Sequence, residues 1–133
     1  MVKRILLAEI FFVGISVAVL HKIALSLSLY WNIWWFDIAM HLMGGALIAL
    51  ITLFFIYDSK FFNFSIKKPI VVFSAALGVT LIIGLGWELW ELYMGFTNIY
   101  EDQIDTMADL INDTIGAIAV YLYSKNKICQ KEN

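Results

Sequence analysis

The sequence is poor in charge and in cysteine. Only 15% of its 133 residues are charged and 62% are hydrophobic, whereas soluble domains average about 25% charged and about 45–50% apolar residues. This composition excludes an ordinary soluble globular protein and a disordered chain. The single cysteine, Cys129, excludes a disulfide framework. A net charge of −2 offers no basic surface for nucleic acid. The composition that remains is typical of a membrane protein.

Four stretches are long and apolar enough to cross a bilayer, which takes about 20 mainly apolar residues. They run over residues 4–30, 32–57, 69–94 and 104–124. The only proline, Pro69, stands in the first turn of the third stretch, where a helix tolerates it. We therefore expect an all-α integral membrane protein. It should be one membrane domain over residues 1–133, with four transmembrane helices in an antiparallel bundle.

Basic residues and tryptophans mark opposite faces of this expected bundle. Eight of the nine basic residues lie on one side, and the exception is Lys22. The tryptophans lie toward the other side, as an aromatic belt would; they are Trp31, Trp34, Trp35, Trp87 and Trp90. The positive-inside rule then predicts an inner-membrane protein with both termini in the cytoplasm. A signal peptide is the weaker alternative, because Glu9 interrupts an apolar run that is too long for one.

Acidic residues inside the apolar stretches are the informative feature, because each ionised side chain at mid-bilayer costs about 2.5–3.5 kcal/mol. In the second, third and fourth stretches the ionisable residues share one helix face, and the first stretch contributes a single histidine. They are His21; Asp37 and His41; Glu88 and Glu91; and Asp105, Asp109 and Asp113, with Asp102 one turn earlier. The two histidines both lie about 13 Å from the outer end of their helices. We therefore predict one polar site, built by all four helices and open to the extracytoplasmic side.

Carboxylates gathered with imidazoles repel one another unless a cation or shared protons intervene. Carboxylate and imidazole together suit divalent metals such as Mn, Fe or Zn, whereas more carboxylate-rich sites suit Mg or Ca. We predict a divalent-metal site whose ligands come from His21, Asp37, His41, Glu88, Glu91, Asp102, Asp105 and Asp109. Three of these, Glu88, Glu91 and Asp105, are also the candidate catalytic residues. A metal there would activate water for hydrolysis of a lipid or lipid-linked substrate.

Plainer interpretations of the same residues stay open. Asp37 and His41 could pair only with each other, and the acidic residues of the third stretch could be hydrated at a helix end. Residues 102–109 could form an acidic loop and a helix start in water. The alternative functions are a cation or proton transporter and a non-catalytic accessory protein. Transport is the weaker of these, because the inner half carries little polar lining beyond Glu9. Glycine-containing helix faces would allow a homodimer.

Three motifs stand at these positions. They are D-x3-H at Asp37 and His41, E-x2-E at Glu88 and Glu91, and D-Q-x-D-T-x2-D over residues 102–109, with a later Gly116-Ala117. Together they resemble the YjdF-like family of bacterial inner-membrane proteins of unknown function, over about residues 20–117. The chain also has a looser likeness to VanZ-like membrane proteins, but it lacks the arginine of their pattern.

The resemblance implies a membrane location and no established activity. It extends less firmly to a histidine at His21 and a tyrosine at Tyr30. Asp113 is not part of the family pattern, so it ranks below Asp109. The chain also lacks the additional N-terminal helices of the longer family members.

Overall fold

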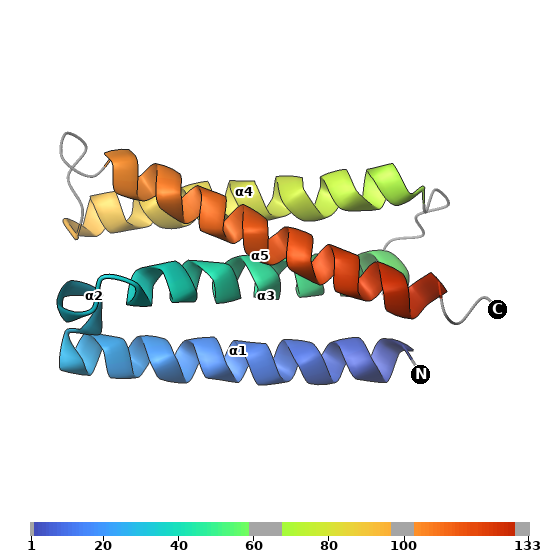
Figure 1. The fold of residues 1–133 in the computed structure, drawn as a ribbon, viewed down its shortest axis with the longest axis horizontal. Coiled ribbons are helices and arrows are strands. Elements are labelled where there is room, and N and C mark those ends of the chain that lie inside the picture. The colour runs from blue at the N-terminus through green and yellow to red at the C-terminus, as the bar shows by residue number, and fades with distance from the viewer. Residues whose placement is uncertain (1, 59–67, 97–102, 130–133) are drawn as a thin grey trace.

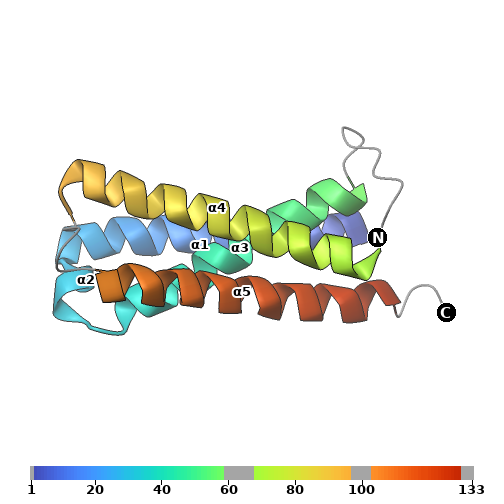
Figure 2. The ribbon, with the colours of Figure 1, turned by 90° about the horizontal axis from the view of Figure 1, so that it is seen from above.

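The computed structural model describes residues 2–58, 68–96 and 103–129, apart from the side chains of residues 2–5, 58 and 126–129. Over these residues the chain forms helices and no strand, which confirms the predicted all-α fold. The helices are α1 (Val2–Leu27), α2 (Leu29–Asn32), α3 (Phe36–Asp58), α4 (Pro69–Met94) and α5 (Gln103–Cys129). The four long helices lie along a common axis, and α1 begins at the end of the bundle where α5 finishes (Figures 1 and 2).

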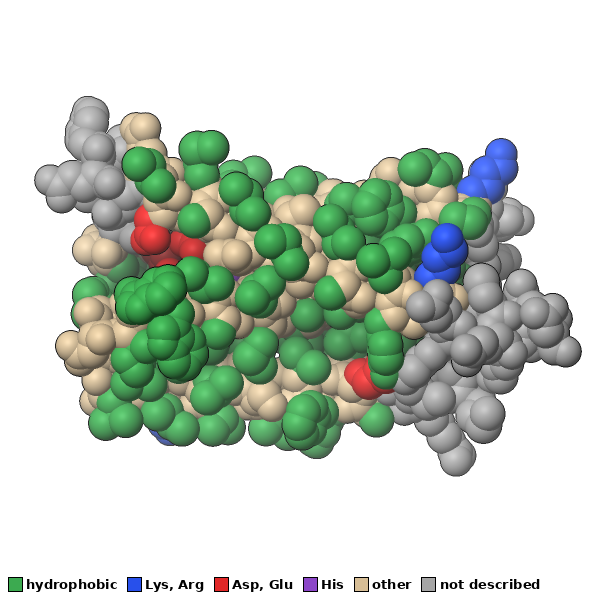
Figure 3. Space-filling view, in the orientation of Figure 1, with side chains coloured by type: hydrophobic (Ala, Val, Ile, Leu, Met, Phe, Trp, Pro, Cys, Tyr) green, Lys and Arg blue, Asp and Glu red, His purple; other side chains and the backbone are tan. Residues whose placement is uncertain are grey.

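Three of the long helices are long and apolar enough to cross a membrane. These candidate spans are Leu6–Leu27, Phe36–Tyr57 and Pro69–Met94. Figure 3 shows hydrophobic side chains over most of one long face of the molecule, as a lipid-facing surface requires. Helix α5 is not among the candidate spans, because its first turns carry Asp105, Asp109 and Asp113. The expected count of four spans is therefore not confirmed, whereas the membrane character of the protein is.

The connection between the first two long helices differs from the sequence-based boundaries. Helix α1 ends at Leu27 rather than Tyr30, because Ser28 adopts a left-handed conformation with φ of 54°. The single turn of α2 follows, and α3 begins at Phe36. Hydrophobic residues run through this connection without a glycine or a proline, so neither composition nor a helix breaker marks the break. The consequence is that Tyr30 turns back toward His21.

Helices α3 and α5 approach each other closely because glycine faces backbone on both sides. A Cβ atom added at Gly45 would lie 2.6 Å from the Cα atom of Asp113. One added at Gly116 would lie 2.9 Å from the backbone nitrogen of Ala46. Real Cβ atoms essentially never come closer than 3.0 Å to such neighbours. Small residues at a helix contact are the usual means of close packing in membranes, and here they press the acidic face of α5 against α3.

Helix α4 packs on both α3 and α5, whereas α1 packs mainly along α3. The buried face of α4 repeats every fourth residue, as one stripe of an α-helix should; it consists of Val72, Ala76, Thr80, Gly84 and Glu88. Among the described residues α1 and α4 do not pack along each other. Helix α3 thus lies between α1 and α4 and packs against both.

Candidate metal centre

The predicted site residues that the structure describes lie toward one end of the bundle. Asp37 and His41 occupy the first turns of α3, and the acidic residues of α5 occupy its first turns. Glu88 and Glu91 stand near the end of α4, and His21 stands near the end of α1. Figure 3 shows acidic side chains gathered where α4 ends and α5 begins. Asp102 lies outside the described residues.

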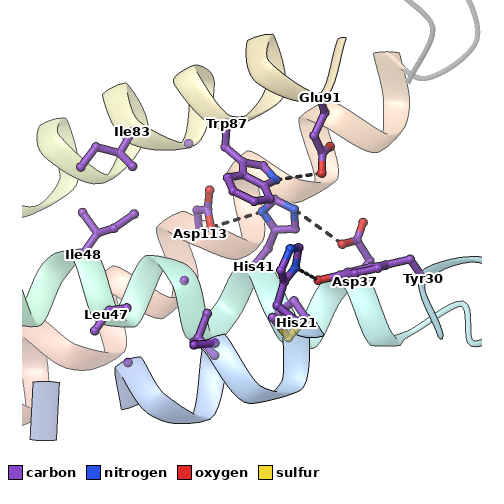
Figure 4. Close-up of a pocket in the computed structure, with 16 residues that line it drawn as sticks. His21, Tyr30, Asp37, His41, Leu47, Ile48, Ile83, Trp87, Glu91 and Asp113 are labelled. Atoms are coloured by element: carbon purple, nitrogen blue, oxygen red, sulfur yellow. Dashed lines mark hydrogen bonds and ion pairs between the residues drawn. The ribbon is translucent and has the colours of Figure 1, made fainter. Parts of the chain in front are cut away.

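His41 is the centre of this group. Its ring is buried, as are Asp109 and Asp113. The Nε2 atom lies 3.7 Å from Asp37 Oδ1 and 3.8 Å from Asp109 Oδ1. On the other side of the ring, Nδ1 lies 3.4 Å from Asp113 Oδ1 (Figure 4). His41 thus pairs with carboxylates of two helices, so the interpretation that it pairs only with Asp37 does not hold.

The two ring nitrogens of His41 have different partners. A carboxylate accepts hydrogen bonds and does not donate them, so the Nδ1–H group donates to Asp113. Nε2 faces the carboxylates of Asp37 and Asp109, and it can bind a cation only in the neutral ring, where its lone pair is exposed. A histidine held by a carboxylate at one nitrogen and free to bind a metal at the other is a recurrent arrangement in metal sites.

The spacing of the ligand atoms suits a cation. Three residues offer atoms that all lie within 4.8 Å of one another: Asp37, His41 and Asp109. Two ligands bound to zinc at about 2.1 Å each can be at most about 4.2 Å apart, and both Nε2 distances fall inside this limit. The carboxylate oxygens of Asp37 and Asp109 lie within 4.8 Å of each other, so they would approach by up to about 0.6 Å to reach the same limit. The structure therefore brings three of the predicted ligands together.

Asp113 completes the site, although the sequence analysis ranked it below Asp109 and left it out of the ligand set. Asp113 is not among the three residues whose ligand atoms lie together, and it contacts the opposite nitrogen of the His41 ring. Its carboxylate fits because glycines leave room: a Cβ atom at Gly84 would lie 2.5 Å from Asp113 Oδ2, and one at Gly44 would lie 3.8 Å from Oδ1. The signal for Asp113 was its i, i+4 spacing from Asp109.

Glu88 lies apart from this group and has one oxygen without a hydrogen-bond partner. Its side chain is only 8% exposed. Oε2 accepts a hydrogen bond of 2.8 Å from Thr106 Oγ1, whereas Oε1 is buried and unpartnered. Leaving a buried polar atom unpaired costs about 1–3 kcal/mol. A proton on this oxygen or a ligand bound to it would remove that cost. Asp105 is exposed in the first turn of α5. Its negative charge repels the carboxylates of Asp37, Glu88 and Asp109.

His21 and Glu91 form a second group across the cavity from His41. His21 Nδ1 lies 2.7 Å from the hydroxyl of Tyr30. Its ring meets the ring of Trp87 edge-on, with centroids 5.8 Å apart. The indole nitrogen of Trp87 donates a hydrogen bond of 2.9 Å to Glu91 Oε1. His21 and Glu91 therefore lie outside the three-ligand group.

Tyr30 holds its proton firmly. Burial, together with the negative charges of Asp37 and Glu91, raises the pKa of its phenol from 10.0 to about 12. The hydroxyl is thus a permanent hydrogen-bond partner for His21 at physiological pH. Sequence reasoning placed Tyr30 at the end of a transmembrane stretch and missed this contact, because the contact depends on the turn at Ser28.

A cavity of about 410 Å³ lies beside the His41 group. Polar side chains line one part of it, and Figure 4 shows them; they are His21, Tyr30, Asp37, His41, Glu91 and Asp113. The rest is mainly apolar, and its walls include Gly14, Leu47, Ile48 and Ile83. The candidate site thus combines a metal-binding geometry with space for a small molecule.

A family model described as a predicted membrane protein, DUF2238, matches residues 2–127. The match covers nearly the whole chain and agrees with the resemblance to the YjdF-like family. No curated protein and no solved structure matches the chain. The family description gives a location and no reaction, so the chemistry has to be inferred from the site.

Proposed function

We propose, from the premise that this chain belongs to the DUF2238 family of predicted membrane proteins, that it is a metal-dependent hydrolase of the membrane. Its substrate would be a lipid or a lipid-linked molecule. Its metal would be a divalent ion held by Asp37, His41 and Asp109. This assignment goes beyond the family description and is supported by the geometry at His41.

The observation that carries the proposal is the hydrogen bond from His41 Nδ1 to Asp113. Here Nδ1 is occupied, and Nε2 lies between two carboxylates at 3.7 Å and 3.8 Å. Three like-charged carboxylates around a buried ring repel one another, and a divalent cation would relieve that repulsion.

A bound divalent metal would lower the pKa of a coordinated water and polarise the bond to be cleaved. Glu88 is our candidate for the general base, because Thr106 holds Oε2 and leaves the buried Oε1 without a hydrogen-bond partner. Glu91 and Asp105 remain candidate catalytic residues. Glu91 lines the cavity, and Asp105 is exposed at the start of α5.

The orientation in the membrane is part of the proposal. We infer that α5 is the fourth span, that the protein resides in the inner membrane, and that both termini are cytoplasmic. Helix α1 begins at the end of the bundle where α5 finishes (Figure 1). Lys68, directly before α4, and Lys125, near the end of α5, belong to that same end, which supports a cytoplasmic position for it. The tryptophans before α3 are 53–83% exposed, as residues of an interfacial belt would be. The site would then face the extracytoplasmic side.

Transport receives less support than hydrolysis. A cation crossing the bundle would need polar groups along its path. Beyond Asp113, the buried residues of α3, α4 and α5 that the structure describes include no charged side chain; they are mainly apolar, and their polar members are Thr52, Thr80 and Ser124. The site is therefore better suited to chemistry at one membrane face.

The experiment is a hydrolysis assay on the purified protein with an anionic phospholipid in mixed micelles, with and without Mn²⁺. We expect Mn²⁺-dependent release of the head group. Glu88→Gln should lower the rate by about 10²–10⁴-fold, the usual contribution of a general base. Glu9→Gln is the matched control, because Glu9 lies toward the opposite end of α1 and bonds to Tyr123. Equal rates for Glu88→Gln and Glu9→Gln would contradict the assigned role.

A further inference from the structure

The cavity beside His41 has two chemically different ends. Along α3 its lining extends from Asp37 to Ile48, which is about 16 Å of helix, or about half the thickness of a bilayer core. Its volume of about 410 Å³ lies within the range of about 300–1,000 Å³ typical of small-molecule sites. The ligand it fits is therefore elongated, with a polar end and an apolar end.

One side of this cavity faces the surroundings of the bundle. Helices α1 and α4 form its two walls, and over the described residues they do not pack along each other. The ring contact between His21 and Trp87 joins them at the polar end. Farther along, the lining residue Ile83 is 49% exposed. A molecule in the bilayer could thus reach the cavity sideways, between α1 and α4.

An apolar space that opens on a bilayer is filled most readily by hydrocarbon. Apolar cavities do not hold water, and an empty space loses dispersion contacts with its walls. A lipid chain supplies those contacts and leaves no polar group unsatisfied. The polar end alone is acidic and would repel an anion, but a divalent cation at His41 would offset two of these negative charges and give phosphate oxygens a positive centre to bind.

We propose that one hydrocarbon chain of a lipid with an anionic phosphate head group occupies this cavity. The chain enters between α1 and α4, and the head group reaches the cation at Asp37, His41 and Asp109. The head-group contact rests on the proposed function, because only a bound cation makes this end attractive to phosphate. The position of the chain rests on the cavity itself.

The test uses protein reconstituted with Mn²⁺ in phosphatidylcholine vesicles that contain phosphatidylglycerol with a photoreactive diazirine in mid-chain. Labelled peptides are identified by mass spectrometry. A Cβ atom at Gly14 makes only ordinary contact with Leu47, at 3.7 Å, so Gly14→Phe should fill the cavity. Gly78→Phe is the matched control, because Gly78 faces open space. A second pair is Ile83→Trp, at the cavity edge, against Ile82→Trp, at a residue that is 71% exposed.

We expect labels on the cavity-lining parts of α1 and α3, reduced about tenfold by Gly14→Phe and Ile83→Trp. The two control variants should label like the wild type. Equal labelling of all four variants would overturn the proposal, as would labels confined to the outer faces of the helices. Mn²⁺ binding is measured on the same samples. If Mn²⁺ binds and the cavity is not labelled, this inference fails alone; absence of Mn²⁺ binding is instead a failure of the proposed function.

Discussion

Replacing Gly116 with alanine should separate α3 from α5 and dismantle the metal site. The added Cβ would lie 2.9 Å from the nitrogen of Ala46 and closer still to the carbonyl oxygen of Leu42. Both neighbours are backbone atoms of α3 and cannot rotate away. Restoring an ordinary contact of 3.4 Å requires the helices to move apart by at least about 0.5 Å, and overpacking of this kind costs about 1–3 kcal/mol.

The movement matters because metal ligands tolerate displacements of only about 0.2 Å. Asp109 and Asp113 would move with α5, whereas Asp37 and His41 would stay with α3. Isothermal titration with Mn²⁺ in detergent should therefore show a loss of affinity of at least about tenfold. Gly78→Ala is the control, since its Cβ meets nothing within 4 Å, and it should bind Mn²⁺ like the wild type. Circular dichroism and gel filtration establish that both variants are folded. A folded Gly116→Ala protein with unchanged affinity would refute the reasoning.

Two further predictions concern the partners of the histidines. Asp113→Asn removes the charge that holds His41 Nδ1 and should lower the affinity for Mn²⁺ about 10–100-fold. Asn112→Ala, at the neighbouring residue, is the control and should bind Mn²⁺ like the wild type. Equal affinities of the two variants would argue against a role for Asp113. Because the pKa of Tyr30 is raised from 10.0 to about 12, the stability that depends on its phenol is complete below pH 10 and is lost as the pH rises to about 12. Thermal melts between these pH values should therefore show a smaller loss for Tyr30→Phe than for the wild type, and identical losses would contradict the buried contact with His21.

The membrane character of the chain and the end of the bundle that carries the site could be read from local patterns. The spacing of Asp37 and His41 puts both on one helix face whatever the helix packs against. Long apolar runs predict spanning helices in the same way. These features depend only on residues close together in the sequence, which is why they could be predicted. The structure and the family match agree with them.

The choice of partners for His41 could not be read in this way. Several acidic residues stand at similar depths, and the sequence offers no means to rank them. The register between α3 and α5 determines which of them reach His41, and Gly45 and Gly116 set that register through backbone contacts. For the same reason the sequence did not predict the contact between Asp113 and His41. Glu88, Glu91 and His21, predicted as ligands, lie apart from the three-ligand group. Their roles as ligands stay predictions.

The central claim is that His41 binds a divalent cation through Nε2. The most direct measurement is pulsed electron paramagnetic resonance on Mn²⁺-loaded protein that carries isotope-labelled histidine. The account predicts hyperfine coupling from one imidazole nitrogen, retained in His21→Ala because His21 is engaged with Tyr30, and lost in His41→Ala. The absence of any coupling in the wild type, or its persistence in His41→Ala, would contradict the claim.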